Sequence, residues 1–251
     1  SMTYSLKDSP FAPLLTSCAS GGGYLAFIGG GGKTTLMEEL GEELHRAFPA
    51  KTVALTTTTT VWPPKVLPLI AEDDTDKAVE ELKEDRLAYI GEYCEVRGLK
   101  KIEVPSWGVE KLATLADFIL IEADGSHERP LKAHASWEPA YPDLPCFTIA
   151  VIGASGFNEP VIEVVHRPEL FCRRMKLSSH AKATPELIAQ EMGQEHQKEH
   201  LIFDVVFVNQ CDESDLYIEA AQLFAETLHA TLPDMPIYYG SARAKTCTRA
   251  D

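Results

Sequence analysis

Apolar runs alternate with amphipathic stretches along most of this chain. The runs predict strands at residues 24–28, 52–56, 87–91, 117–122, 146–152, 202–208 and 236–239. Between them, apolar residues recur at helical spacing and predict helices near 33–48, 75–84, 107–115, 168–176, 184–192 and 215–231. Strands that alternate with helices are typical of a parallel sheet covered by helices. We therefore predict a three-layer α/β fold with a mostly parallel sheet and helices on both faces.

The alternation is interrupted between residues 153 and 200, where helical stretches follow one another. This segment, 153–200, is the candidate for a small helical insertion. With 251 residues, of which 45% are hydrophobic, the chain is long enough to bury a substantial core. We predict that residues 1–251 form a single domain.

A glycine-rich segment connects the first predicted strand to the first predicted helix. It consists of Gly29-Gly30-Gly31-Gly32-Lys33-Thr34-Thr35. Glycines let backbone N–H groups turn toward an anion, and a helix N-terminus attracts negative charge. Lysine at this point contacts the β- and γ-phosphates of a nucleotide, and the next hydroxyl binds magnesium. The segment therefore predicts the phosphate-binding loop of a P-loop NTPase, with Lys33 as a catalytic residue and Thr34 as a Mg²⁺ ligand.

This loop has the short form G-x-x-G-K-T-T. The longer pattern G-x-x-x-x-G-K-[ST] requires glycine five residues before Gly32, and Phe27 occupies that position. All of Gly29–Thr35 are predicted to contact the nucleotide.

A second motif lies at the end of the strand predicted at 117–122, where Glu122 and Asp124 precede Gly125. In phosphate-loop hydrolases, an acidic residue at this strand end holds magnesium and a following glycine lies near the γ-phosphate. We predict that Glu122 is catalytic and holds Mg²⁺. Asp124 is the candidate that positions the attacking water or the substrate.

Five consecutive threonines, Thr56–Thr60, lie at the end of the strand that starts near Val53. In related hydrolases a threonine beside the phosphate loop binds the magnesium ion, and Thr58 is our candidate for this role. The alternative is a strand end, because β-branched residues are common there.

A third motif follows the strand predicted at 202–208. Asn209 and Asp212 match the pattern N-K-x-D, with Gln210 in place of Lys. In guanine-nucleotide proteins, this Asp accepts hydrogen bonds from guanine that adenine does not offer, and the Asn steadies the loop. After the next helix, Ser241 and Ala242 resemble the S-A-[KR] loop that contacts the guanine carbonyl. GTP is therefore favoured over ATP.

The loop from Glu122 to Pro142 carries several charged and imidazole side chains: His127, Arg129, Lys132, His134 and Glu138. It follows the carboxyl end of a predicted strand, where ligands bind in open α/β sheets. We interpret it as a surface for a substrate or a partner.

The formal net charge of −15 argues against nucleic acid as a partner. Six cysteines without a C-x-x-C pair indicate free thiols in a reducing compartment. No apolar run approaches the roughly 20 residues of a membrane span. We expect a cytoplasmic protein that does not enter membranes; the sequence carries no signal for its oligomeric state.

Several motifs occur together: the phosphate loop, the threonine run, Glu122-Ala-Asp-Gly, Pro130-Leu-Lys132, Glu138-Pro139, His166-Arg-Pro-Glu169 and Asn209-x-x-Asp212. This combination, spread over nearly the whole chain, resembles the YqeC family. That family is described as accessory to selenium-dependent molybdenum hydroxylases and as having a role in selenium cofactor biosynthesis. The resemblance implies such a hydroxylase or its cofactor as a partner.

The predicted function is Mg²⁺-dependent hydrolysis of GTP or ATP in the maturation of such hydroxylases or their cofactor. One alternative is a nucleotide-dependent switch or chaperone without chemistry of its own. Another is an ATP-dependent kinase or ligase, because G-x-x-G-K-T-T also occurs in enzymes that activate carboxylates.

Overall fold

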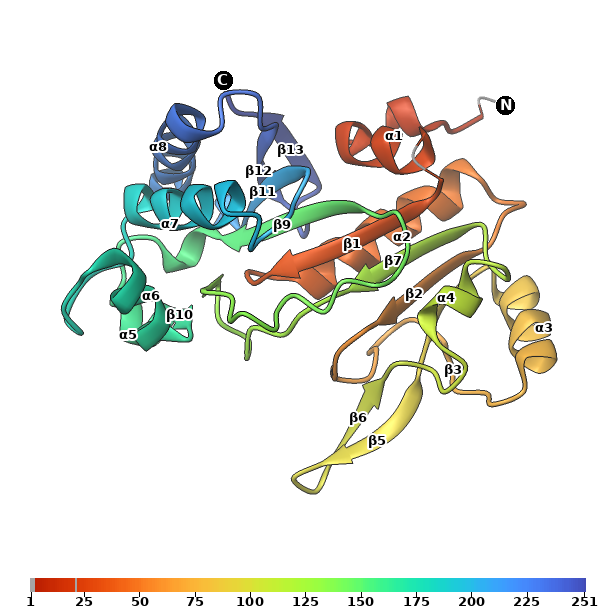
Figure 1. Ribbon diagram of the computed structural model, residues 1–251. Helices are drawn as coiled ribbons and strands as arrows, with labels where there is room; N and C mark the ends of the chain where they lie inside the picture. The colour runs from red at the N-terminus through yellow and green to blue at the C-terminus, as the bar shows by residue number, and fades with distance from the viewer. Residues whose placement is uncertain (1–2, 21) are drawn as a thin grey trace. The chain divides into compact units, whose positions relative to one another are not determined.

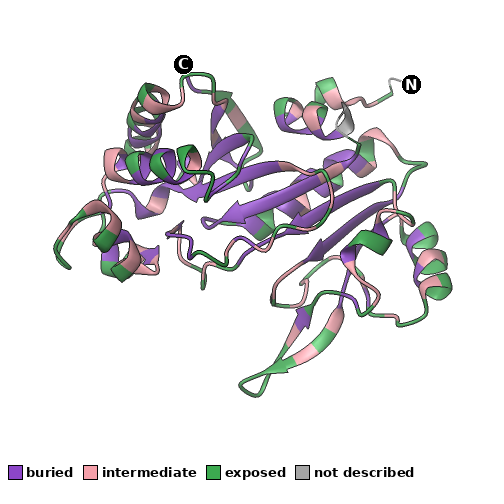
Figure 2. Cartoon of the chain, in the orientation of Figure 1, coloured by how far each residue is buried: buried purple, intermediate pink, exposed green. Residues whose placement is uncertain are grey.

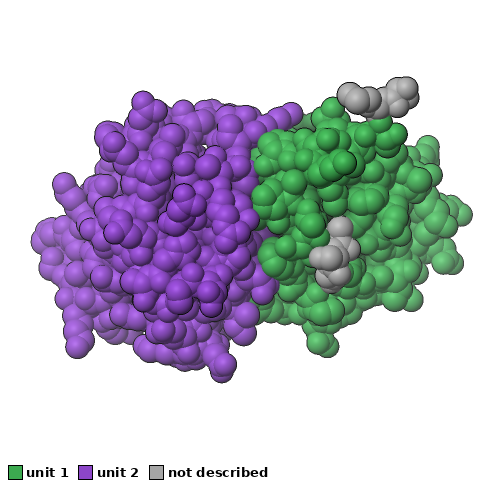
Figure 3. Space-filling view, turned by 90° about the horizontal axis from the view of Figure 1, so that it is seen from above, with its two compact units in different colours: residues 1–27, 36–125, 140–147 green, residues 28–35, 126–139, 148–251 purple. Residues whose placement is uncertain are grey.

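The computed structural model describes residues 3–20 and 22–251; Ser1, Met2 and Gly21 lie outside the described residues. The chain divides into two compact units, which Figure 3 shows in two colours. Unit 1 consists of the described residues up to Phe27 together with Leu36–Gly125 and Ala140–Phe147. Unit 2 consists of Ile28–Thr35, Ser126–Pro139 and Thr148–Asp251. The single domain expected for residues 1–251 stays a prediction.

Five parallel strands form the sheet of unit 1, in the order β1-β7-β2-β4-β3. They are β1 (Tyr24–Gly29, whose last two residues belong to unit 2), β2 (Val53–Thr57), β3 (Leu69–Ile70), β4 (Leu87–Ile90) and β7 (Phe118–Glu122). Strands β1, β2, β4 and β7 are buried over nearly their whole length (Figure 2). Burial on both faces explains why these segments are continuous apolar runs rather than alternating ones.

Helices cover both faces of this sheet. They are η1 (Leu6–Asp8), α1 (Ala12–Ser20), α2 (Lys33–Ala47, whose first three residues belong to unit 2), α3 (Thr75–Asp85) and α4 (Val109–Leu112). On one face α2 packs so closely that a Cβ on Gly41 would lie 3.0 Å from Leu55 Cδ1 and 3.9 Å from Leu120 Cδ2. On the other face Ala54 and Ile119 form a core cluster with α3 and α4. Neighbouring strand residues therefore serve opposite faces, as a pleated strand requires.

An antiparallel hairpin also belongs to unit 1. It is made of β5 (Glu92–Val96) and β6 (Leu99–Glu103). The turn residues Arg97 and Gly98 both have positive φ, at 52° and 77°. Two central residues with positive φ are typical of the tight turns that join hairpin strands.

In unit 2 the strand order is β13-β12-β11-β9, with only β13 antiparallel. These strands are β9 (Phe147–Gly153), β11 (Val205–Asn209), β12 (Ile237–Ser241) and β13 (Thr246–Arg249). The end of β1 lies beside β9, since the Gly30 N–H donates to the Val151 carbonyl at 3.0 Å. A separate parallel pair joins β8 (Leu131–Lys132) to β10 (Val165–His166).

The helices of unit 2 are η2 (Ala154–Gly156), α5 (Val161–Val164), α6 (Pro168–Met175), α7 (Pro185–Gln197), η3 (Cys211–Glu213) and α8 (Asp215–Thr231). Helices α7 and α8 lie side by side (Figure 1), and a Cβ on Gly193 of α7 would be 3.1 Å from Thr231 Cγ2. Helix α7 begins at a Thr184 N-cap, whose hydroxyl accepts from the Leu187 N–H, and has Pro185 at its first position. The N-cap and the proline thus favour the start of α7, and α8 buries its apolar face.

The predicted α/β class with mostly parallel strands flanked by helices is confirmed. Each predicted strand and helix overlaps an observed one. The predicted segment 153–200 contains η2, α5, β10, α6 and all of α7. The prediction did not include α1, the hairpin β5–β6, or the short strands β3, β8, β10 and β13.

Candidate functional site

The segment between β1 and α2 forms a tight loop in unit 2. Gly29 has φ +99°, and a Cβ there would lie 2.2 Å from the Val151 carbonyl oxygen. Gly31 has φ +68°, and a Cβ there would lie 2.1 Å from the Gly153 nitrogen. Both the backbone conformation and the space exclude any side chain at these two positions. The glycines are needed for the packing of the loop against its neighbours as well as for its curvature.

Two amides of this loop are used inside the protein. The Gly30 N–H donates to the Val151 carbonyl at 3.0 Å, and the Gly31 N–H donates to the Arg129 carbonyl at 3.4 Å. These two N–H groups have acceptors within the protein, and the contacts predicted between Gly29–Thr35 and a nucleotide stay a prediction. Gly32 leads directly into the first turn of α2, and a helix N-terminus attracts negative charge.

Lys33 is the first residue of α2 and is only 6% exposed. Its Nζ donates to the Gly29 carbonyl at 2.9 Å, so the side chain folds back over the loop. The ammonium group thus lies at the loop itself, and its contact with phosphates stays a prediction.

Asn209 connects the phosphate loop to a second loop of unit 2. Its Nδ2 donates to the Gly31 carbonyl at 2.8 Å, and its Oδ1 accepts from the Ala242 N–H at 2.9 Å. Asn209 and Ala242 are 4% and 1% exposed. The buried amide side chain satisfies one acceptor and one donor of the backbone, so it fixes three segments relative to one another.

Gln210 has a left-handed backbone, with φ +71°. Its Oε1 accepts a hydrogen bond from the Ser155 hydroxyl at 2.6 Å. A Cβ on Gly153 would lie 2.5 Å from the same oxygen, so this side chain is pressed against the residues that support the phosphate loop. Ser155 was not predicted as a site residue, because nothing in its local sequence marks it as a partner of Gln210.

Asp212 forms an ion pair with Arg243, whose Nη2 lies 2.9 Å from Asp212 Oδ2. The hydrogen bond from Arg243 lowers the pKa of Asp212, and a further one from Ser241 acts in the same direction. The Ser241 hydroxyl also accepts from the Ala244 N–H at 3.0 Å. The structure therefore brings together Asp212, Ser241 and Ala242, the residues expected to contact the base.

The acidic motif lies in unit 1. Glu122 and Asp124 are 4% and 2% exposed. The Glu122 carbonyl accepts from the Thr57 hydroxyl and from the Thr58 N–H, each at 3.0 Å. The Thr58 hydroxyl donates to the Ala140 carbonyl at 2.6 Å. Its proton is thus used within the protein, and its role as a magnesium ligand stays a prediction.

The charge of Glu122 affects two other groups of unit 1. Burial and then the charge of Glu122 raise the pKa of Glu38. The same two causes raise the pKa of the Tyr89 hydroxyl well above its usual value. The carboxylate therefore produces a negative potential at the end of β7, which a divalent cation would offset.

Within the described residues, no group of three or more His, Cys, Asp and Glu side chains is arranged to hold a metal ion. Magnesium in nucleotide sites is bound by few protein ligands together with phosphate oxygens and water, so this observation does not conflict with the predicted donors. Thr34 belongs to unit 2 and Glu122 to unit 1. The magnesium site that takes a ligand from each of them stays a prediction.

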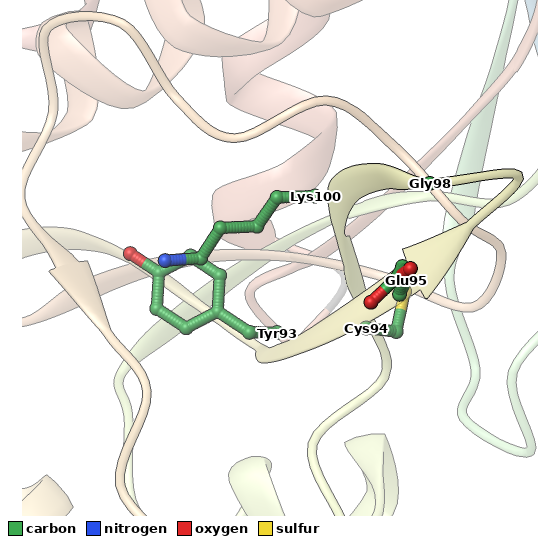
Figure 4. A pocket seen from close by; sticks show the side chains of 5 residues that line it. All are labelled: Tyr93, Cys94, Glu95, Gly98 and Lys100. Atoms are coloured by element: carbon green, nitrogen blue, oxygen red, sulfur yellow. The ribbon is translucent and has the colours of Figure 1, made fainter.

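An open hollow lies on the hairpin β5–β6, lined by Tyr93, Cys94, Glu95, Gly98 and Lys100 (Figure 4). The Lys100 ammonium lies 3.9 Å from the centre of the Tyr93 ring. None of the predicted site residues lines this hollow, so it contributes nothing to the predicted site. None of the helices in the described part of the chain is long and apolar enough to span a lipid bilayer.

The phosphate loop and the acidic motif both fall in the part of the chain that matches a known family. A model of the YqeC protein family matches residues 25–169. The chain belongs to this family. The uncharacterized protein YqeC of Escherichia coli strain K12 is 31% identical over 147 residues, which are 57% of this chain and 57% of that protein. The chain thus matches little more than half the length of its curated relative.

Two solved structures are similar to this YqeC-family chain. HypB from Helicobacter pylori in complex with nickel is 13% identical, with 94% of this chain and 86% of that chain covered and a TM-score of 0.41. The hydrogenase maturation factor HypB from Archaeoglobus fulgidus is 10% identical, with 91% and 86% covered and a TM-score of 0.43.

Proposed function

We propose that this protein binds and hydrolyses a nucleoside triphosphate, with GTP favoured over ATP. The observation that carries the proposal is the loop between β1 and α2. Lys33 folds over this loop, and Asn209 joins the Gly31 carbonyl to the Ala242 N–H. The phosphate loop carries the cation Lys33, which suits the phosphates of a nucleotide. The loop hydrogen-bonded to it carries the acidic residue Asp212, which suits the base.

In this proposal the N–H groups at the start of α2 and the Lys33 ammonium hold the β- and γ-phosphates. Thr34 supplies a hydroxyl to Mg²⁺, which neutralises developing charge on the phosphates when it is bound. Glu122 and Asp124 keep the roles that the sequence predicts for them. Phosphoryl transfer requires mainly positioning and charge neutralisation, which are the roles that this proposal gives to these groups.

The preference for guanine rests on Asp212. A carboxylate accepts two hydrogen bonds from the N1–H and the exocyclic amine of guanine, and adenine has no such pair of donors. The hydrogen bond from Arg243 lowers the pKa of Asp212, so the side chain is a carboxylate at neutral pH. A carboxylate has room for more than one donor, so the contact with Arg243 is compatible with this role.

We further propose that hydrolysis serves the maturation of selenium-dependent molybdenum hydroxylases or of their cofactor. The chain belongs to the YqeC family, which supports this proposal. The sequence resemblance described above implies this role for members of that family. The client would be identified by testing which hydroxylase copurifies with the protein in a nucleotide-dependent way.

The first test is calorimetric titration of the protein with non-hydrolysable GTP and ATP analogues in the presence of Mg²⁺. We expect the GTP analogue to bind at least about tenfold more tightly than the ATP analogue. Lys33→Ala should weaken binding by about 100-fold, because a desolvated charge–phosphate contact is lost. Lys51→Ala, which removes the same charge from an exposed position outside the loop, should leave affinity unchanged.

The outcomes separate the competing functions. Preference for the ATP analogue would contradict the role of Asp212 and favour a kinase or ligase. Binding of GTP without measurable turnover, alone or with a client hydroxylase, would favour a switch or chaperone. Absence of binding to either analogue would contradict the proposal as a whole.

A further inference from the structure

A cluster of charged and imidazole side chains lies beside the phosphate loop in unit 2. We call His127, Lys132, His166 and Arg167 the cationic cluster. They come from residues 126–139 and 165–167, which the parallel pair β8–β10 joins. The main chain of the first segment supports the phosphate loop, because the Arg129 carbonyl accepts from the Gly31 N–H at 3.4 Å. The cluster and the loop are therefore parts of one connected structure.

Glu138 fixes the positions of the two permanent cations in the cluster. Its Oε2 lies 2.5 Å from Lys132 Nζ, and its Oε1 lies 2.7 Å from Arg167 Nε. The Lys132 side chain is fully buried, whereas that of Arg167 is 29% exposed. Two cations face one carboxylate, which leaves a local excess of positive charge in a chain whose formal net charge is −15.

The cluster presents donors and an aromatic surface to solvent. His127 is exposed and His166 half-buried, and the centres of their rings are 4.4 Å apart. The ring of Trp137, a residue that is 73% exposed, lies 5.2 Å from the Arg167 guanidinium carbon. Arg167 uses Nε for Glu138, and its guanidinium carries further N–H donors. Trp137 thus adds an exposed aromatic ring to the donors of the cluster.

The titration of His166 reports the local potential. Burial and then the charge of Lys132 lower the pKa of His166 to about 4, with smaller contributions of the same sign from His127 and Arg167. Glu138 acts in the opposite direction and is outweighed. The half-buried imidazole is therefore in a positive potential, which favours a negatively charged ligand.

The backbone of the cluster is strained at two of its residues. His127 has φ +50° and Arg167 has φ +67°, a conformation that costs free energy for residues other than glycine. Strain of this kind is common at binding sites, where surrounding contacts hold a side chain in position. Both Glu138 oxygens are paired with cations, which disfavours a metal ion as the ligand of this cluster.

We propose that the cationic cluster binds the phosphate group of a second substrate, a phosphorylated small molecule, next to the nucleotide. The Arg167 guanidinium and the two imidazoles supply more N–H donors than a carboxylate ligand has oxygens. A phosphate group has more oxygens and therefore matches these donors better. Trp137 flanks the bound molecule. The role as a second-substrate site rests on the proposed function, whereas the binding of phosphate does not.

The test is a titration of the full chain, carrying ¹⁵N-labelled histidine, with inorganic phosphate at constant ionic strength. The imidazole signals of His127 and His166 should shift together along one saturable curve, and the signal of the exposed His180 should not. In a Lys33→Ala variant, the same curve should be retained. Loss of the shifts in that variant would assign the phosphate to the phosphate loop and overturn this proposal, while supporting the proposed function.

Matched variants identify the residue responsible. Arg167→Gln should weaken phosphate binding by about tenfold, because a charge-assisted contact is lost. Arg173→Gln removes the same charge from an exposed position on α6 and should change binding by less than about twofold. Equal losses in both variants, or no loss in either, would overturn the proposal.

A conservative variant guards against misfolding. Arg167→Lys keeps a positive charge opposite Glu138 and removes the planar guanidinium, so it should weaken phosphate binding by about threefold. If Arg167→Gln does not fold, this variant and the His180 reference decide the question. Unchanged affinity in Arg167→Lys would then count against the assignment of the guanidinium.

Discussion

The phosphate loop and the cationic cluster are neighbours in unit 2, yet they are held in position by different forces. Backbone contacts hold the loop: Gly29 and Gly31 approach Val151 and Gly153 closely enough to exclude a Cβ. Ion pairs hold the cluster, with Glu138 between two cations. Steric contacts are indifferent to pH and salt, whereas ion pairs depend on both. Added side-chain volume is therefore expected to disturb the phosphate loop. A change of pH, salt or side-chain charge is expected to disturb the cationic cluster.

The largest effect is expected from Gly31→Ala. Its Cβ would lie 2.1 Å from the Gly153 nitrogen, in addition to the unfavourable φ of +68°. We expect the free energy of unfolding to fall by about 3 kcal/mol or more, measured by urea denaturation, and nucleotide binding to be lost.

Gly98→Ala is the matched control for this steric effect. Gly98 has φ +77° and no heavy atom within 4 Å of an added Cβ. Only the backbone cost of about 1 kcal/mol should remain. Equal losses in the two variants would show that the close approach at Gly31 contributes nothing.

Asn209→Ala should have the next largest effect. The change leaves the Gly31 carbonyl and the buried Ala242 N–H without the hydrogen bonds that Asn209 makes. We expect a loss of about 2–3 kcal/mol in the free energy of unfolding. Gln222→Ala, at an exposed position on α8, should cost less than about 0.5 kcal/mol. A small effect at Asn209 would mean that the two loops hold their positions independently.

Glu138→Gln tests the part that depends on charge. Burial alone would raise the pKa of Glu138, but hydrogen bonds from Arg167 and Lys132 outweigh it and lower the pKa from 4.5 to about 2. The stabilisation is therefore fully present above pH 4.5 and is lost as the pH falls toward 2. We expect the wild type to be more stable than the variant by about 2 kcal/mol at pH 7.

That difference in the free energy of unfolding should shrink as acid is added and disappear near pH 2. Glu163→Gln, at an exposed position in α5, should differ from the wild type by less than about 0.5 kcal/mol. A difference between wild type and Glu138→Gln that is constant from pH 7 to pH 2 would contradict the ion-pair account.

The smallest effect is expected from Arg243→Ala. The guanidinium that pairs with Asp212 is largely exposed, so salt and water screen the contact. Affinity for a GTP analogue should change by less than about threefold, and any change should vanish at high salt. A large change would show that Arg243 itself contacts the nucleotide.

Local patterns predicted much of this molecule. The strand, glycines and helix around residues 24–48 follow from neighbouring residues alone, because parallel buried strands are apolar throughout and helices repeat every 3.6 residues. The cap and proline at Thr184-Pro185 likewise mark the start of α7. The hairpin β5–β6 was missed because its strands are mostly exposed and do not alternate cleanly, although Gly98 was an available turn signal.

Contacts between distant residues were beyond sequence reasoning. Asn209 was predicted to steady a loop, but its bond to Gly31, which is 178 residues away, depends on tertiary packing. The pairing of Ser155 with Gln210 and the convergence of Trp137 on Arg167 have no local signature either. The sequence linked His166-Arg-Pro-Glu169 only to a family resemblance. In the structure, the His166 ring lies beside the His127 ring, and Arg167 pairs with Glu138.

The hydrogen bonds from Gly30 and Gly31 to the carbonyls of Val151 and Arg129 have a thermodynamic consequence. The loop takes its shape from contacts within the protein, so little conformational entropy is lost when an anion associates with it. Hydrogen–deuterium exchange at these two amides should accordingly be slow, and it should change little when nucleotide is added.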